Sequence, residues 1–325
     1  MFTNAKRQLA LLLMLALLIP VLAACGGAAT SAPTAAPAEQ PTTGSAAQPT
    51  AAEAPTTGSA EASTAATSGG AMSGKLTIAG SSALLPLVQE AANQYQAKNP
   101  GAQITVTAGG SGAGRTQVCQ GKIDIGDSDV KLSDKEKTDL SCSGAVETPV
   151  AIQAFAPVAN KEGLGSVTSL SKDQLISIFA GKVTNWKDVG GADQEIVLIN
   201  RAKGSGTRSQ MGKFLFGGDD TMFATGASEE DNSETVKTTV AQTPGAISYL
   251  GFAYVSDPSL VALGVDGTMP TKENIQAGKW PIGGPGYMIT KAAPDGLAKD
   301  FLAFVTGDFQ KDPAFDKLGF VAVDE

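Results

Sequence analysis

Three short turns rich in glycine and serine each stand between a strand-like run and a helix-like run, and this repeated order limits the possible folds more than any other feature. The turns are Gly80-Ser81-Ser82-Ala83, Gly110-Ser111-Gly112-Ala113-Gly114 and Arg201-Ala202-Lys203-Gly204-Ser205-Gly206-Thr207. Strands that alternate with helices in this way predict an α/β fold, in which a parallel sheet carries helices on both faces.

The ends of these turns have the chemistry of an anion site. At the start of a helix the first backbone amides have no partner within the helix, and the helix dipole is positive there. Arg201 adds a guanidinium, which can meet two oxygens of one anion at the same time. Ser82, Ser111, Ser205 and Thr207 also have a simpler interpretation as helix N-caps. Three such turns in one chain predict a site for a tetrahedral oxyanion.

The rest of the body continues the alternation. Apolar runs predict strands at 76–79, 104–107, 148–158, 196–199, 246–250 and 286–290. Helical spacing predicts helices at 84–99, 112–120, 171–179, 207–216, 232–241, 274–278 and 297–305.

The first residues have the order of a secretory signal. Lys6 and Arg7 precede an apolar run at 9–22, and Leu22-Ala23-Ala24-Cys25 resembles the lipobox of bacterial lipoproteins. The alternative, an uncleaved membrane helix, is disfavoured because the run is short and contains Pro20. We expect residues 1–24 to be a signal peptide and Cys25 to carry a lipid.

Residues 26–74 contain no valine, isoleucine, leucine or aromatic residue and so cannot form a core. Together with Cys25 they form a predicted disordered linker at 25–74. Residues 75–325 exceed one typical core, which indicates two lobes. Within them, Cys119 and Cys142 are an even pair in an exported chain, so either a disulfide or two unpaired buried thiols fits.

The complete absence of histidine excludes several enzyme classes. Ser-His-Asp catalysis, histidine-ligated zinc and histidine general bases are not available to this chain. The glycine-rich turns match neither the P-loop nor the dinucleotide-binding fingerprint. A formal net charge of −8 disfavours nucleic acid as a partner. We therefore expect a binding protein without catalytic residues, metal or cofactor.

An acidic run at 124–129 adds one more ligand to consider. Its carboxylates lack the rest of a calcium loop, and they are open to a simpler interpretation as surface acids near a helix start. A carboxylate only accepts hydrogen bonds, so Asp129 beside an anion site would favour an oxyanion that still carries a proton. Phosphate near neutral pH carries one and sulfate does not, which makes Asp129 a candidate selectivity residue.

These residues resemble the extracytoplasmic phosphate-binding lipoproteins of ABC-type phosphate uptake systems, members of the periplasmic binding protein group. The similarity spans essentially all of residues 75–325. It is carried by the three turns, by Asp124-Ile125-Gly126 with Ser128-Asp129, by Pro244-Gly245-Ala246-Ile247-Ser248-Tyr249, and by Gly319-Phe320-Val321-Ala322-Val323.

The resemblance implies a type II two-lobed clamp with two crossovers, lobe I comprising 75–156 and 256–325 and lobe II comprising 157–255. It implies a monomer, anchored outside the cytoplasm through Cys25, that binds inorganic phosphate and delivers it to ABC permease subunits. The implied phosphate ligands are Ser82, Ala83, Ser111, Asp129, Arg201, Ser205, Gly206 and Thr207.

One position departs from the family pattern. Some members have an acidic residue between the arginine and Gly-Ser-Gly-Thr, where it orients the guanidinium, and this chain has Lys203 there. Three other functions remain open on the sequence: the same clamp for sulfate, molybdate or tungstate, a phosphate-sensing surface protein, and a surface phosphatase.

Overall fold

The computed structural model describes residues 72–323. The predicted signal peptide, the lipidation site at Cys25 and the linker up to residue 71 lie outside the described residues. None of the helices within residues 72–323 is long and apolar enough to cross a membrane.

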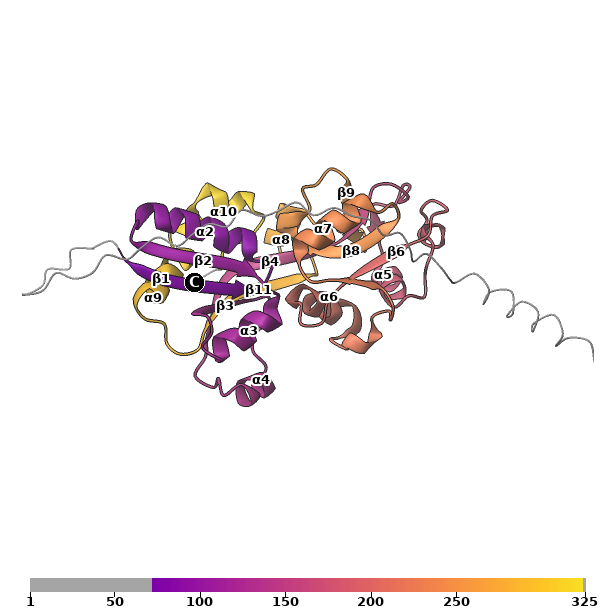
Figure 1. Ribbon diagram of the computed structural model, residues 1–325. Coiled ribbons are helices and arrows are strands. Elements are labelled where there is room, and N and C mark those ends of the chain that lie inside the picture. The colour runs from indigo at the N-terminus through magenta and orange to yellow at the C-terminus, as the bar shows by residue number, and fades with distance from the viewer. Residues whose placement is uncertain (1–71, 324–325) are drawn as a thin grey trace, which may run out of the picture. The chain divides into compact units, whose positions relative to one another are not determined.

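One mixed sheet runs through the described residues, in the order β2-β1-β3-β11-β4-β8-β6-β7, with β9 paired to β4 (Figure 1). Its strands are β1 (Gly74–Gly80), β2 (Ala102–Ala108), β3 (Ile125–Ser128), β4 (Val146–Asn160), β6 (Val197–Arg201), β7 (Ser228–Glu230), β8 (Ala246–Gly251), β9 (Leu260–Ala262) and β11 (Gly283–Thr290). A separate two-stranded sheet pairs β5 (Ser169–Leu170) with β10 (Gly264–Val265).

Helices cover this sheet. The α-helices are α2 (Leu85–Lys98), α3 (Ser111–Cys119), α4 (Asp134–Asp139), α5 (Lys172–Phe179), α6 (Gly206–Phe216), α7 (Ser233–Gln242), α8 (Lys272–Gln276), α9 (Gly296–Thr306) and α10 (Pro313–Lys317). Short 3-10 turns are η1 (Trp186–Val189), η2 (Asp220–Met222), η3 (Phe252–Tyr254) and η4 (Phe309–Lys311). The mixed α/β class agrees with the fold that the alternation predicts.

The first part of the sheet is parallel, as the alternation predicts. Strand β1 pairs in parallel with β2 and β3, while β11 runs antiparallel to β3 and β4. The periodicity did not reveal the antiparallel strands, because the direction of a strand depends on the path of the chain that precedes it. In Figure 1, α2 and α3 lie on opposite faces of these strands.

Strand β4 connects two halves of the structure. Residues 146–154 pair with β11, and residues 155–159 of the same strand pair with β8. The chain passes back before β11, so two connections join the halves. We call lobe I the residues 72–154 and 283–323, and lobe II the residues 155–282.

Buried side chains support this division. Leu76, Leu87, Phe301 and Phe309 belong to one buried cluster in lobe I. Side chains after residue 256 pack in lobe II instead: Leu263, Val265, Trp280 and Ile282 join the cluster of Phe155 and Phe179. On this packing we propose that the chain returns to lobe I at Gly283 rather than at residue 256.

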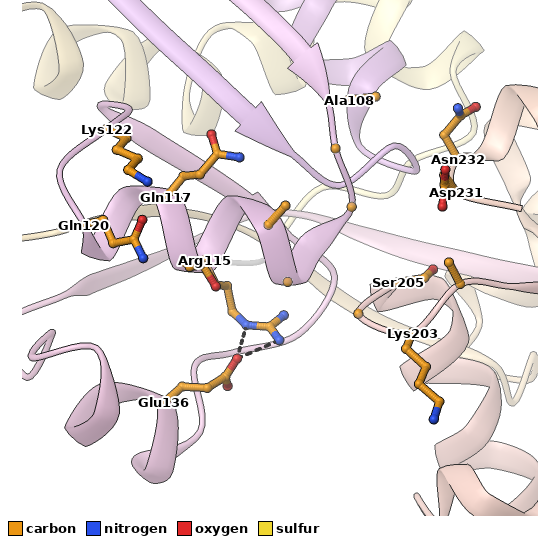
Figure 2. A pocket seen from close by; sticks show the side chains of 17 residues that line it. Ala108, Arg115, Gln117, Gln120, Lys122, Glu136, Lys203, Ser205, Asp231 and Asn232 are labelled. Carbon is orange, nitrogen blue, oxygen red and sulfur yellow. Dashed lines mark hydrogen bonds and ion pairs between the residues drawn. The ribbon is translucent and has the colours of Figure 1, made fainter.

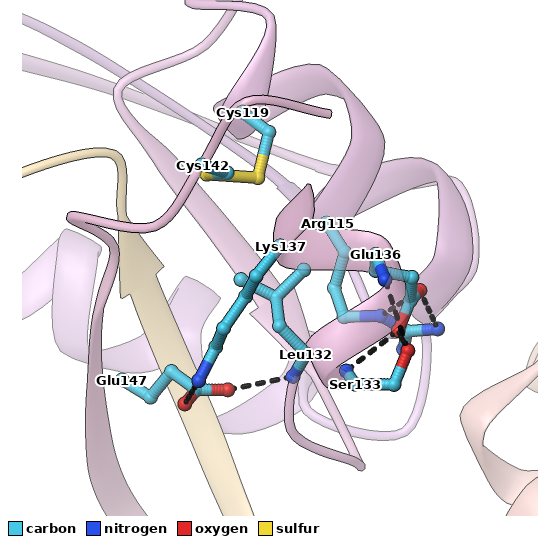
Figure 3. Close-up of a disulfide and its surroundings, with 8 residues drawn as sticks. All are labelled: Arg115, Cys119, Leu132, Ser133, Glu136, Lys137, Cys142 and Glu147. Carbon is cyan, nitrogen blue, oxygen red and sulfur yellow. Dashed lines mark hydrogen bonds and ion pairs between the residues drawn. A yellow bond between two sulfur atoms is a disulfide. The ribbon is translucent and has the colours of Figure 1, made fainter. Parts of the chain in front are cut away.

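A disulfide links the end of α3 to the loop that follows α4 (Figure 3). Cys119 and Cys142 are both 1% exposed, and they pack with Val118, Leu132 and Ile289. Of the two states that the sequence left open, the structure has the bonded one. Because α3 begins at Ser111, the disulfide fixes the far end of a helix whose first residue is a predicted ligand.

Candidate functional site

The turn between β1 and α2 is held against β3 by its own backbone. The amide of Ser81 donates to the carbonyl of Asp127 at 2.9 Å. A Cβ at Gly80 would lie 2.1 Å from the same carbonyl oxygen, so only glycine allows this approach. Ser82 and Ala83 follow directly and are buried. The amide of Ala83 donates to Ser81 Oγ at 3.1 Å.

Asp129 lies just beyond β3, and its carboxylate receives hydrogen bonds from both lobes. Ser81 Oγ and Gln153 Nε2 donate to Oδ1, the second at 3.1 Å, and Thr207 Oγ1 from lobe II donates to Oδ2 at 3.2 Å. Its own amide donates to Ser111 Oγ at 3.0 Å. Asp127 and Asp129 of the acidic run are each 1% exposed, so of its three acids only Asp124 lies on the surface.

Two opposing effects act on the Asp129 carboxyl. Burial raises its pKa, while the hydrogen bonds from Ser81 and Gln153 and the charge of Arg201 lower it. Burial is the larger effect, so the pKa lies above its ordinary value. A carboxylate in this setting accepts a proton or a hydrogen bond readily, which suits contact with a protonated oxyanion.

Arg201 ends β6 with its guanidinium buried and without a counter-ion among the described residues. The residue is 1% exposed, and it forms no ion pair with any carboxylate of residues 72–323. Burial lowers its pKa. A buried charge without a partner costs several kcal/mol or more, so this position favours a bound anion.

Backbone carbonyls and hydroxyls hold the guanidinium of Arg201 in place. Its Nε donates to the carbonyl of Glu230 at 3.2 Å, and its Nη2 donates to the carbonyl of Asp231 at 3.1 Å. Nη2 also reaches Ser82 Oγ of lobe I at 3.2 Å. Lys203 is exposed and takes no part in these contacts. Main-chain oxygens thus orient the guanidinium of Arg201, and Lys203 does not.

The turn that begins α6 meets lobe I directly. Ser205 Oγ caps the helix by accepting from the amide of Arg208 at 3.2 Å. A Cβ at Gly206 would lie 2.2 Å from Ser111 Oγ and 2.7 Å from Asp129 Oδ2. The structure therefore brings together all eight predicted ligand positions, from both lobes.

Three further residues join the site without having been predicted for it. Ser233, the first residue of α7, is fully buried; its amide donates to Ser82 Oγ at 3.1 Å, and its Oγ accepts from Arg201 Nη1 at 3.4 Å. Gln153 donates to Asp129, and Tyr254 donates to the carbonyl of Ser82 at 2.7 Å. Ser233 follows the same strand-then-helix rule as the three turns, but β7 before it is only three polar residues long.

A cavity of about 830 Å³ opens beside this cluster, between α3 of lobe I and the turn at 202–205 of lobe II (Figure 2). Arg115 on its wall is already paired with Glu136 at 2.8 Å. The lobes also meet through the amide of Gly112, which donates to the carbonyl of Gly204 at 2.9 Å. Within residues 72–323 no group of three or more aspartate, glutamate, cysteine or histidine side chains is arranged to hold a metal.

The arrangement consists of hydrogen-bond donors, one buried cation and one buried acid. Amides and hydroxyls at four helix starts supply the donors, from α2, α3, α6 and α7. Such a set binds an oxyanion through its oxygens, and the acid accepts a hydrogen bond from a protonated one.

Comparisons with known proteins point to the same ligand class. A model of the PBP superfamily domain matches residues 44–308. The phosphate-binding protein PstS of Bacillus subtilis is 43% identical over 252 residues, which cover 77% of this chain and 81% of that protein. PstS of Borreliella burgdorferi is 28% identical over 263 residues, covering 76% and 90%.

Solved structures agree. A putative phosphate ABC transporter substrate-binding protein from Clostridium perfringens, with bound phosphate, superposes with a TM-score of 0.71 at 28% identity, covering 77% of this chain and 100% of that one. An ABC-type phosphate transport receptor from Vibrio cholerae gives 0.61 at 26% identity, covering 76% and 100%. The predicted fold class, a two-lobed clamp, is confirmed by these neighbours.

Proposed function

This chain belongs to the PBP superfamily, among the phosphate-binding PstS proteins, and on that basis we propose that it captures inorganic phosphate outside the cytoplasm as the substrate-binding protein of an ABC transporter. The observation that carries the proposal is that a buried guanidinium, Arg201, which forms no ion pair within residues 72–323, lies in the same site as a buried hydrogen-bond acceptor, Asp129. Phosphate fits both, because it is an anion that keeps a proton near neutral pH.

The contacts described above support the following ligand roles. Arg201, Ser205 and the amides of Gly206 and Thr207 supply donors from lobe II. Ser82, Ala83 and Ser111 supply donors from lobe I. Asp129 accepts the proton that the anion carries, and Ser233 adds a ninth position because its hydroxyl lies between Ser82 and Arg201. Full coordination requires both lobes, so binding energy favours the closed form.

The N-terminal part of the chain anchors the protein at the cell envelope. Cys25 carries a lipid, and the linker lets the two-lobed body reach a permease subunit as a monomer. The body binds and releases phosphate without turnover, consistent with relatives that are named as binding proteins. The first 24 residues act as the secretion signal.

Titration calorimetry with phosphate and with sulfate tests the proposal. We expect tight, saturable binding of one phosphate per chain and far weaker binding of sulfate at the same pH. Equal affinity for the two anions would favour a general oxyanion clamp, and binding of neither would remove the proposed function.

A further inference from the structure

A second buried acid, Asp127, lies next to the site, and its side chain takes no part in the contacts described above. It sits on β3 and is 1% exposed. Side chains alternate along a strand, and a Cβ at the preceding Gly126 would lie 2.5 Å from a backbone oxygen of α3. Asp127 therefore faces away from α3, on the same side as Ile125.

That side of β3 is apolar. Ile125 packs in the buried cluster of lobe I with Leu84 and Leu87. Met288 of β11, directly opposite Asp127 in the sheet, belongs to the same cluster. An aspartate that points into this cluster loses the hydration that stabilises its charge.

Two buried acceptor oxygens near this position have no hydrogen-bond donor. Its Oδ1 has no hydrogen-bond partner within the described residues, and the same holds for Oε1 of Gln153, whose amide nitrogen binds Asp129. No lysine or arginine of residues 72–323 forms an ion pair with Asp127. A proton on the carboxyl would change one of these acceptors into a donor.

The helices and strands that pack against Asp127 place no positive charge next to its carboxylate. The first turn of α2 has no acidic or basic residue, and Gly80 and Met288 are the neighbours of Asp127 on β1 and β11. Arg115 of α3 is on the other face, bonded to Ser128 and Glu136. From lobe II, Arg201 acts on Asp129.

The nearest charge that acts on Asp127 is therefore of the same sign. Asp129 follows two residues later, just beyond the end of the same strand. Burial, and after it the charge of Asp129, raises the pKa of Asp127 well above its ordinary value. A phosphate dianion bound against Asp129 would add more negative charge at the same place.

We infer that Asp127 carries a proton in the closed, phosphate-loaded protein, and that phosphate capture is coupled to proton uptake by this carboxyl group. The inference rests on the proposed function, because phosphate supplies the added charge. One proton passes from solvent to a carboxylate oxygen of Asp127, and no other bond changes. Where Asp127 is ionised in the free protein, affinity then falls by up to about tenfold for each unit of rising pH.

Calorimetry on three proteins tests the coupling. Phosphate is titrated into the wild type, Asp127→Asn and the control Asp134→Asn, an exposed acid of α4, at several values between about pH 6 and pH 9. Pairs of buffers with different ionisation enthalpies give the number of protons taken up. The titration of phosphate itself is common to all three proteins and cancels in the comparison.

We expect the wild type and Asp134→Asn to take up as much as about one proton more per phosphate than Asp127→Asn at the alkaline end. The affinity of Asp127→Asn should match the wild type within about threefold at the acidic end and exceed it at the alkaline end. Identical proton counts and parallel pH profiles for all three proteins would overturn the inference while leaving phosphate binding intact.

Carbon NMR of the Asp127 carboxyl in the wild type gives a readout that requires no variant to fold. We expect the chemical shift of a protonated carboxyl at neutral pH in the phosphate-loaded protein, and a downward shift of the titration midpoint when phosphate is removed. A carboxylate shift at neutral pH with phosphate bound contradicts the inference. Failure of every protein to bind phosphate would instead count against the proposed function.

Stability supplies a phosphate-free check. The folded chain binds a proton at Asp127 that the unfolded chain has released above about pH 4. Folded protein thus binds more protons, so this group lowers stability as pH rises from that value to the raised pKa of the folded state. The unfolding midpoint temperature of Asp127→Asn, relative to that of the wild type, should therefore rise as the pH rises over this range. A difference in midpoint temperature that does not change with pH would contradict a buried, protonated Asp127.

Discussion

Asp129 and Arg201 illustrate how a buried charge gains a function from what surrounds it. The carboxylate of Asp129 has donors on both oxygens, two from lobe I and one from Thr207. The guanidinium of Arg201 has carbonyl and hydroxyl acceptors but no carboxylate among the described residues. Arg201 therefore supplies a positive charge for an anionic ligand. Asp129 supplies a hydrogen-bond acceptor that favours a ligand carrying a proton.

Replacement of Asp129 by asparagine tests its role as the acceptor separately from the charge of Arg201. Asp129→Asn is expected to bind phosphate about 10- to 150-fold more weakly, since a hydrogen bond to a charged group contributes about 1.5–3 kcal/mol. Sulfate binding should stay the same or improve, because the repelling carboxylate is gone. Calorimetry with both anions measures the ratio, and Asp188→Asn, an exposed acid on η1, serves as control. An unchanged ratio would remove Asp129 as the selectivity residue.

Four helices direct their first residues toward the same place, and two of them belong to each lobe. Helices α2 and α3 begin at the turns after β1 and β2, while α6 and α7 follow β6 and β7. Each helix start brings amides that have no partner within the helix, and the positive end of the helix dipole. The position of α3 depends further on the disulfide between Cys119 and Cys142 at its far end.

Loss of this disulfide should affect stability more than binding. A bond that closes a loop of this length, 23 residues in separation, contributes about 3 kcal/mol in the loop-entropy model. We expect Cys119→Ala, Cys142→Ala and the double variant to lose similar stability in denaturant unfolding, because each change alone breaks the bond. Phosphate affinity should stay within about threefold of the wild type, since neither sulfur contacts the site. Additive losses, or lost binding at full stability, would contradict this role for the bond.

Closure of the two lobes depends on a few close contacts between backbones and short side chains. Gly206 leaves no room for a Cβ against Ser111 and Asp129, and the amide of Gly112 reaches the carbonyl of Gly204. Ligand residues from lobe I and lobe II bond to one another only when these surfaces meet. We expect the hinge where β4 and the segment before β11 pass between the lobes, because only these two segments connect the lobes as defined above.

Gly206→Ala should therefore hinder closure while each lobe stays folded. The added methyl group would meet Ser111 Oγ at 2.2 Å, and overpacking of this kind costs about 1–3 kcal/mol. Phosphate affinity is expected to fall about 5- to 150-fold. Small-angle scattering should show contraction with phosphate for the wild type and less for the variant. Gly144→Ala, with its nearest neighbour at 3.7 Å, is the control; wild-type contraction and affinity in Gly206→Ala would show that this contact does not limit closure.

Local patterns in the chain were enough to predict most regular elements. The apolar runs at 76–79 and 246–250 are β1 and β8, and the cap at Ser171 begins α5 with a capping box. The fold class follows from the alternation of strands and helices, and the anion site follows from the residue types of the turns. The phosphate-binding family was predicted from a resemblance that the turns share with other segments of the chain. These features depend only on a residue and its neighbours in the sequence, so the spacing of residue types along the chain is enough to predict them.

Contacts between segments distant in the chain determined the rest. Strand β3 was missed because Gly126, Asp127 and Ser128 have low strand propensity, and pairing with β1 and β11 forms it nonetheless. Ser233 enters the site through Ser82, 151 residues away. The burial of Asp127 likewise results from the packing of α2 and β11 around it. The amino-acid sequence by itself determined which groups can bind an anion. The tertiary structure decided which charged groups are buried, because a side chain loses its hydration only where distant segments pack together.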